Sequence, residues 1–319
     1  MKIVTSGLEF LDIDAYAGCI AYAELLRLKG KNAIAFSSAT INESVPKTVR
    51  SWDVSFSNTY KKNDEDTFIL IDVSEPDYLE KYVEINRVEE VIDHHVGFEE
   101  YWQSRIGDKS NIEFIGAACT QVYEKWTAAN LLSDMSETSA RLLISGILDN
   151  TLNFKANVTT PRDKMAYEEL LKIAHLPSDW SAQYFSECQE SIFSDIQDAL
   201  KNDTKIMRFS NIDANSIAFG QLVIWNAKKV LNEYRSIVEQ TMETISDNWF
   251  INVVSIDEGR SYFLSSNEIV EKWATKVLDI HFLSRLGKAD RLWLRKEVFK
   301  QDQSYAVLRS SITEQNRFL

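Results

Sequence analysis

The feature that most constrains this chain is an apolar run without alternation, residues 68–71, that ends in a carboxylate, Asp72. A strand that is apolar at every position is covered on both faces, as in the centre of a parallel sheet. Other predicted strands lie at residues 1–4, 33–36 and 90–92, and they alternate with helical patterns such as 12–29. This alternation predicts a doubly wound, mainly parallel α/β sheet.

The length and the later part of the chain predict a second domain. The 319 residues exceed what one ordinary hydrophobic core holds. The alternating pattern gives way to predicted strands at 217–222, 249–255 and 261–264, with a long helix predicted at 228–246. We therefore predict a first α/β domain at 1–190, a linker at 191–202 and a second, smaller α/β domain at 203–319.

Composition excludes several classes of protein. With 45% hydrophobic and 26% charged residues, the chain is of the globular rather than the disordered type. No run of eighteen apolar residues and no basic, then apolar leader is present, so we expect a cytoplasmic protein without a membrane partner. The net charge of -13 disfavours nucleic acid as a partner. Three widely spaced cysteines, Cys19, Cys119 and Cys188, are expected to be reduced and buried.

Carboxylates follow the predicted strands at the edge where open α/β sheets bind their ligands. Asp12 and Asp14 follow the first strand, and Asp72 follows the apolar run. Alone, the pair Asp12 and Asp14 is better explained as a helix cap and a solvated carboxylate. Asp72 fits a turn cap equally well, but a carboxylate there also costs desolvation unless a cation meets it.

Two of the four histidines change this balance, because His94 and His95 follow the predicted strand 90–92 directly. Adjacent side chains at a strand end diverge, so that one imidazole can ligate a metal while the other reaches another part of the pocket. Asp93 is then best placed to hold an imidazole by its second nitrogen. Together with the carboxylates, the pair predicts a metal site; a surface loop with paired histidines is the alternative.

The segments 7–15, 68–75, 91–96 and 146–155 resemble, in order, the four motifs of the DHH phosphoesterase superfamily. The stretch 148–160, LDNTLNFKANVTT, is similar to the fourth motif of the manganese-dependent (family II) inorganic pyrophosphatases, which stand close to the exopolyphosphatases. In the second domain, residues 203–205 and 294–296 more faintly resemble motifs of the DHHA2 domain. The resemblance implies a metal-binding DHH domain and a DHHA2-like domain that clamps the substrate.

The resemblance also implies a set of site residues. It implies two divalent ions, manganese first and magnesium or cobalt as alternatives, held by Asp12, Asp14, Asp72, His94 and Asn150. It assigns catalysis to Asp72 and His95, and contact with the substrate phosphate to His95, Lys205, Arg295 and Lys296. The last two lie in a basic stretch, 285–300, that is otherwise explained as a solvated helix face.

Two positions depart from the family pattern. Leu8 stands where the family has a histidine ligand, and Asn150 where it has an aspartate, with an acidic residue displaced to Asp149. Divalent ions prefer carboxylate and imidazole donors, so each metal position loses one strong donor. We therefore predict loosely held metal and partial occupancy, unless a one-residue shift of the loop brings Asp149 into the place of Asn150.

Three functions remain open on this reading. The first is hydrolysis of a small phosphorylated substrate, pyrophosphate or short polyphosphate. The second is a degenerate site that binds a phosphorylated ligand or a protein partner, and Leu8 and Asn150 are the evidence for it. The third is a phosphodiesterase of short oligonucleotides, disfavoured because the ten glycines include no adjacent pair. A homodimer through the first domain is a further possibility.

Overall fold

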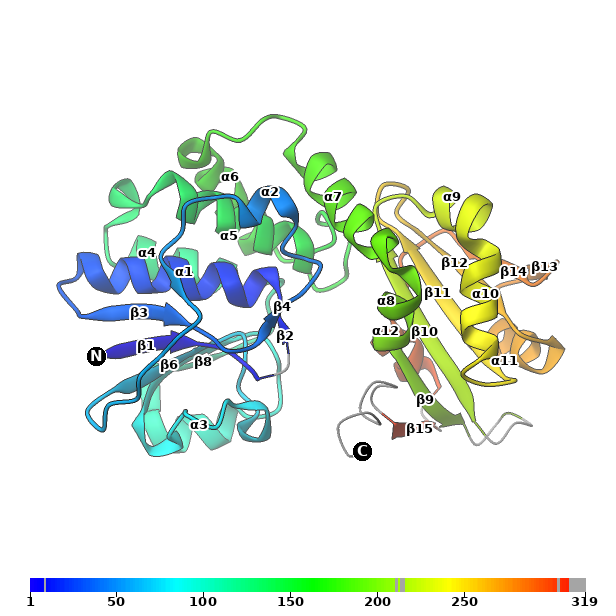
Figure 1. Cartoon of the computed structure of the whole chain (residues 1–319), viewed down its shortest axis with the longest axis horizontal. Helices are drawn as coiled ribbons and strands as arrows, with labels where there is room; N and C mark the ends of the chain where they lie inside the picture. Colours follow the sequence, from blue (N-terminus) through cyan, green and yellow to red (C-terminus); the bar gives the residue numbers. More distant parts are fainter. Residues whose placement is uncertain (9, 210–211, 213–215, 303–304, 310–319) are drawn as a thin grey trace. The chain divides into compact units, whose positions relative to one another are not determined.

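The computed structural model describes residues 1–8, 10–209, 212, 216–302 and 305–309, without the side chains of Lys296, Lys300 and 305–309. The chain divides into two compact units, Met1–Glu187 and Cys188–Leu319 (Figure 1). Each unit has its own sheet and its own hydrophobic core.

The first unit is built on a sheet of six strands in the order β5-β3-β1-β6-β7-β8, and every neighbouring pair is parallel. The strands are β1 (Lys2–Thr5), β3 (Ala33–Phe36), β5 (Phe56–Ser57), β6 (Thr67–Ile71), β7 (Val88–Asp93) and β8 (Ser110–Ile112). The apolar run forms β6, in the middle of the sheet, and its side chains are buried. The predicted parallel α/β fold is confirmed.

Helices cover both faces of this sheet (Figure 1). On one face α1 (Ile13–Leu28) and α4 (Ala118–Ala128) pack on the strands, and α5 (Glu137–Asn150) and α6 (Pro161–Ala174) pack against them. On the other face α3 (Glu99–Ile106) buries Trp102 against strand side chains. Outside the sheet lie α2 (Lys47–Arg50) and a small parallel pair, β2 (Phe10–Leu11) and β4 (Thr40–Ile41).

Gly146 lets α5 pack closely against the first turn of α1. A Cβ atom on Gly146 would lie 2.5 Å from the sulfur of Cys119 and 3.2 Å from Oδ1 of Asp14. Real side chains do not tolerate the first distance. The end of α5 is therefore held against Asp14.

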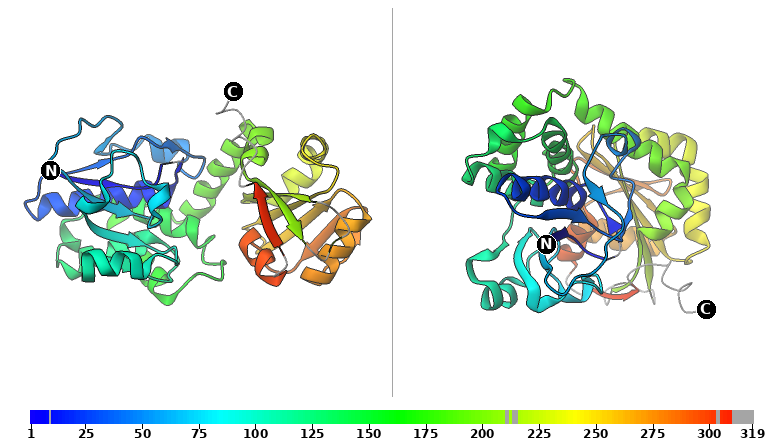
Figure 2. Two further views of the ribbon diagram at one scale, coloured as in Figure 1. Left: turned by 90° about the horizontal axis from the view of Figure 1, so that it is seen from below. Right: turned by 60° about the vertical axis from the view of Figure 1, so that its left-hand side comes forward.

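The second unit has a mixed sheet of seven strands in the order β13-β14-β12-β11-β10-β9-β15, in which only β10 and β11 pair in parallel. Its strands are β9 (Thr204–Phe209), β10 (Ile217–Ile224), β11 (Trp249–Ser255), β12 (Arg260–Ser265), β13 (Phe282–Leu283), β14 (Leu286–Ala289) and β15 (Tyr305–Arg309). Figure 2 shows helices on both sides of this sheet.

Two hydrophobic cores lie on the two faces of the second sheet. One contains side chains of α11 (Glu268–Leu278) and α12 (Arg295–Gln301), and the other contains side chains of α10 (Arg235–Glu243). The single helix predicted at 228–246 is instead α9 (Ala227–Lys229), a π-helical turn (Val230–Tyr234) and α10. Helical periodicity alone does not distinguish a short π turn from continuous α-helix, because both keep the chain helical.

The segment predicted as a linker, 191–202, differs in the structure. It consists of the end of α7 (Trp180–Ser194) and of α8 (Ile196–Asn202). Phe193, Ile196 and Leu200 are buried in one core of the second unit. Because these apolar side chains are covered, the segment is part of the second unit, and the division falls between Glu187 and Cys188.

Two expectations about the chain as a whole have structural counterparts. The three cysteines are free and buried, as predicted. Among the described residues, no helix combines the length and the apolar character needed to cross a bilayer.

Candidate metal centre

Asp72 sits at the end of the central strand β6 in an uncommon backbone conformation. Its φ is 60°, although it is not a glycine, and its N–H donates to the carbonyl oxygen of Ile92 at 2.8 Å. Such strained positions persist where the surrounding structure fixes them, often at functional sites. The side chain is only 6% exposed, and its Oδ1 atom has no hydrogen-bond partner among the described residues.

Asp93 organises the two histidines that follow it. Its fully buried carboxylate accepts the backbone N–H groups of His94 (2.8 Å) and His95 (3.1 Å). The same Oδ1 lies 2.8 Å from Nδ1 of His95, so the other ring nitrogen of this exposed imidazole faces outward. The contact predicted for Asp93 is therefore present.

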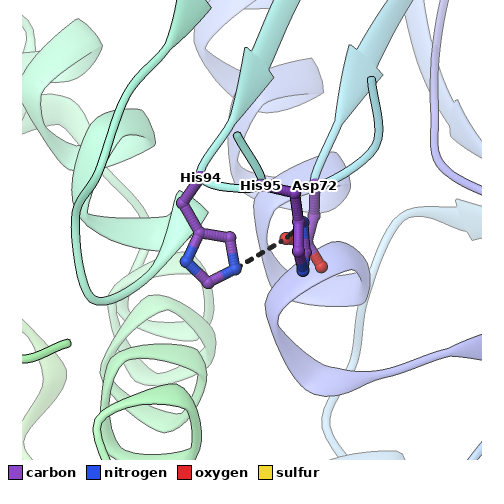
Figure 3. Close-up of side chains that lie close together, drawn as sticks. All are labelled: Asp72, His94 and His95. Atoms are coloured by element: carbon purple, nitrogen blue, oxygen red, sulfur yellow. Dashed lines mark ion pairs between the residues drawn. The ribbon is translucent and has the colours of Figure 1, made fainter. Parts of the chain in front are cut away.

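The ring of His94 is oriented by a backbone carbonyl. Its Nδ1 lies 3.1 Å from the oxygen of Ile115, which can only accept, so Nδ1 carries the proton in this bond. That leaves Nε2 to face the carboxylates, 3.2 Å from Oδ1 of Asp72 and 3.9 Å from Oδ2 of Asp14. Figure 3 shows Asp72 and the two histidines turned toward one another. A ligand atom from each of these three lies within 4.8 Å of the others.

Asp14 is fully buried, and the beginning of α4 holds it. Its two carboxylate oxygens accept the N–H groups of Ala118 and Cys119, each at 2.7 Å. The first N–H groups of a helix have no partner inside the helix, so they stabilise an anion there. Asp12 caps α1, and its Oδ1 accepts the N–H of Ala15 at 3.0 Å. Asp12 is therefore a helix cap, as one interpretation of the sequence has it. This bond occupies one lone pair of Oδ1, so the carboxylate still has donor capacity for a metal.

The two departures from the family pattern lie near these residues. Leu8 follows Gly7, which lies against Val73, and the Leu8 N–H donates to the oxygen of Tyr78 at 2.9 Å. Its half-buried side chain offers no metal donor. Asn150 ends α5, and its side chain makes no hydrogen bond to the described residues.

Asp149 was not among the predicted ligands, yet it belongs to the same charged cluster. Its Oδ1 accepts from the hydroxyl of Tyr184 at 2.9 Å. Burial and the charge of Asp12 raise the pKa of Asp149 to about 7, and Asp14 adds to this effect. The sequence held one signal for it: Asp149 lies three residues after Gly146, so both are on one face of α5.

The site holds more negative charge than its own cations offset. Burial and the charge of Asp72 raise the pKa of Asp14 to about 6, and the pKa of Asp72 is also raised, by burial and the charge of Asp12. Burial opposes the positive charge of His94, but the adjacent carboxylate of Asp72 and the charge of Asp14 outweigh it and raise its pKa to about 10. Neighbouring carboxylates thus compete for protons and for the imidazolium.

The predicted substrate-binding residues of the second unit lie on β9 and α12. Arg295 begins α12, and its guanidinium is bonded to both the side chain and the backbone oxygen of Asp203. Lys205 is half-buried on β9 and takes part in further interactions. The side chain of Lys296 lies outside the described part of the chain. Their contact with a substrate remains a prediction.

These residues fit a divalent cation. Oδ1 of Asp72 is buried without a hydrogen-bond partner, which a bound cation would supply. With Nδ1 of His94 bonded to a carbonyl oxygen, Nε2 is the ring nitrogen that can bind a metal, which would displace its proton. Carboxylate and imidazole donors together suit manganese, magnesium and related ions.

The fold and the site thus define a parallel α/β domain with an acidic, histidine-containing centre at its carboxyl edge, joined to a second α/β domain. No known family model matches the chain. It is 30% identical over 186 residues to a "probable manganese-dependent inorganic pyrophosphatase" of Bacillus mycoides, and equally to one of Bacillus cereus. Each match covers 56% of this chain and 57% of the relative, so it spans little more than half of these proteins.

Solved structures show the same fold. A Methanococcus jannaschii protein assigned to the family II inorganic pyrophosphatases aligns over 95% of this chain and all of its own, with a TM-score of 0.62 and 16% identity. An exopolyphosphatase-related protein of Bacteroides fragilis aligns over 95% of this chain and 90% of its own, with a TM-score of 0.50 and 14% identity. The resemblance to manganese-dependent pyrophosphatases is confirmed, and the fold is shared across both domains.

The raised pKa values predict that stability of the metal-stripped protein falls as the pH rises. In the unfolded chain the carboxylates titrate near 4 and histidine near 6.5. Folding raises the pKa of Asp14 to about 6, of Asp149 to about 7 and of His94 to about 10, so the protonated forms favour the folded state. Their stabilisation is present below the unfolded values and is lost as the pH rises through the folded ones.

We expect the midpoint of thermal unfolding in excess EDTA to be lower at pH 8 than at pH 5.5 by about 5 °C or more. Asp149→Asn, which removes one of the three titrating groups, should reduce this difference. A midpoint that is constant or rises over this range would contradict the electrostatic account of the site.

Proposed function

We propose that this protein is a metal-dependent hydrolase of phosphoanhydrides, with pyrophosphate or short polyphosphate as substrate and manganese as the preferred ion. The observation that carries the proposal is the buried Oδ1 of Asp72, which makes no hydrogen bond to the described residues and lies 3.2 Å from Nε2 of His94. Burying these two polar groups is unfavourable for stability, and a divalent ion bound to both would offset that cost. The sequence similarity to manganese-dependent pyrophosphatases supports the same chemistry.

The first unit supplies the donors. Asp12, Asp14, Asp72 and His94 would hold the metal, with a further donor from the end of α5, where Asn150 was predicted. A divalent ion bound there supplies positive charge for the phosphoryl oxygens and lowers the pKa of a bound water. Asp72 would hold the ion through Oδ1 and so keep the bound water beside the substrate phosphate.

His95 is suited to meet the substrate rather than the metal. Its side chain is 63% exposed, and Asp93 fixes the ring through Nδ1, which leaves Nε2 to donate to a phosphate oxygen. Asp93 also favours the positively charged imidazolium, because its hydrogen bond and the charge of Asp72 outweigh burial and raise the pKa of His95. A protonated His95 donates more strongly to an anionic phosphate.

Cations of the second unit are the proposed phosphate clamp: Lys205, Arg295 and Lys296. Asp203 holds the Arg295 guanidinium by two hydrogen bonds, which reduces the rotamer freedom that Arg295 loses on binding an anion. Closure of a second domain over the metal would exclude water from the reaction.

Leu8 favours a second candidate, a protein that binds a phosphorylated ligand without rapid turnover. An apolar side chain at this position removes a donor that the family pattern places there. Even changes to groups that only hydrogen-bond to metal ligands cost roughly 10- to 100-fold in metal affinity or activity. The two candidates share the metal-binding residues and differ in the release of phosphate.

The proposal is tested by phosphate release from pyrophosphate and tripolyphosphate, with a dinucleotide as the comparison substrate. We expect manganese-dependent release from the first two, and a loss of roughly 100-fold or more in Asp72→Asn, because an anionic metal donor becomes a neutral amide. Asp134→Asn, which changes an exposed carboxylate of the same unit, is the matched control and should leave the rate unchanged.

Cleavage of the dinucleotide in preference to the phosphoanhydrides would contradict the substrate class. Tight manganese binding without any phosphate release would favour the second candidate.

Restoring the missing imidazole should tighten metal binding. We expect Leu8→His to lower the dissociation constant for Mn²⁺ by about 10-fold or more in calorimetric titration, because a strong donor replaces an apolar side chain where the family pattern has a histidine ligand. Leu8→Met keeps the volume without the imidazole and should bind as the wild type does. Equal affinities for all three proteins would show that the leucine is fully compensated.

A further inference from the structure

We propose that Asp149, rather than Asn150, is the residue of α5 that completes the cation site, and that Tyr184 holds it in place. This inference rests on the proposed function, since it concerns the same cation. It identifies a donor that the family pattern puts one residue later, together with a positioning residue on α7.

The close approach of α5 places Asp149 at the site. Gly146 lies against Asp14, with only 3.2 Å from its would-be Cβ to Oδ1 of that carboxylate. A residue three positions later on a helix lies on the same face, one turn further along. Asp149 therefore projects from the face of α5 that already touches the carboxylate cluster.

Tyr184 ties Asp149 to the beginning of α1. Its hydroxyl lies 2.9 Å from Oδ1 of Asp149 and 2.7 Å from the carbonyl oxygen of Ser44. The hydroxyl of Ser44 in turn accepts the N–H of Ile13 at 2.8 Å. Ile13 directly follows Asp12, so this chain of contacts links Asp149 to the segment that carries Asp12.

The donor chemistry favours Asp149 over its neighbour. One of its oxygens accepts from Tyr184, and the other has no hydrogen-bond partner among the described residues, so it is available to a cation. Asn150 offers only a neutral amide oxygen, a weaker donor for a divalent ion. The unpartnered and nearly buried Oδ1 of Asp72 independently marks this cluster as a cation site.

Tyr184 acts through Asp149 in this account and touches no substrate. Its ring is fully buried against Trp180 and Phe185, so the hydroxyl has little freedom to move. A fixed phenol orients the carboxylate before the ion arrives, as hydrogen-bonded partners of metal ligands do.

The experiment measures Mn²⁺ binding to EDTA-stripped full-length protein, by calorimetry and by the electron paramagnetic resonance signal of the free ion. We expect Asp149→Asn to weaken binding by roughly 30-fold or more and Asn150→Ala by less than about 3-fold. Tyr184→Phe should weaken binding by about 10-fold, and should add no further loss in the Asp149→Asn background.

Tyr262→Phe is the matched control for the phenol. Tyr262 donates to Glu258 at 2.8 Å in the second unit, so it is also a tyrosine bonded to a carboxylate, and its loss should not change Mn²⁺ binding. Circular dichroism and thermal unfolding establish that each variant is folded. Tyr184→Phe removes only one oxygen, so it tests the inference even where another variant is unstable.

The outcomes separate this inference from the proposed function. Wild-type protein that takes up no Mn²⁺ would overturn both. Tight binding by the wild type that survives Asp149→Asn but is lost in Asn150→Ala would overturn the inference alone. Independent losses for Tyr184→Phe and Asp149→Asn would overturn the positioning role of Tyr184.

Discussion

The structure of the first unit depends on burying negative charge at one edge of its sheet. Asp14 is fully buried and Asp72 nearly so; the charge of Asp72 adds to burial in raising the pKa of Asp14, and the charge of Asp14 adds to burial in raising the pKa of Asp12. Burial of a carboxylate is unfavourable unless hydrogen bonds or cations offset it. The first N–H groups of α4 offset part of this cost for Asp14, and His94 offsets part of it for Asp72. The remaining charge is what makes the edge a cation site.

The fold supplies the geometry for this concentration of charge. Parallel strands bring their carboxyl ends to one edge, so β6 and β7 present Asp72 and His94 together. The left-handed backbone of Asp72 and the hydrogen bonds of Asp93 then fix how the side chains point. Because residue 146 is a glycine, α5 packs directly against Asp14. In each case the position of the charged group is fixed by backbone geometry and not by a long, flexible side chain.

Much of the fold followed from the sequence, because an apolar strand ending in a carboxylate admits few arrangements. The strand ends, the contact of Asp93 and the order of the motifs could be predicted, since each depends on local sequence. The sequence places Asp149 one residue from the motif position, but its contact with Tyr184 could not be predicted, because Tyr184 comes from a distant segment. The segment 191–202 was equally out of reach: its helices are polar enough to suggest a linker, and only the packing of Phe193 and Leu200 assigns them to the second unit.

The central claim is that these residues form a divalent-cation centre. The most direct measurement is anomalous X-ray diffraction at the manganese edge from crystals grown with Mn²⁺. The account predicts an anomalous peak within coordination distance of Asp72 Oδ1 and His94 Nε2, with a carboxylate oxygen of Asp149 among the ligands. Crystals saturated with Mn²⁺ that show no peak at this edge of the sheet, or a peak only on exposed surface carboxylates, would contradict it.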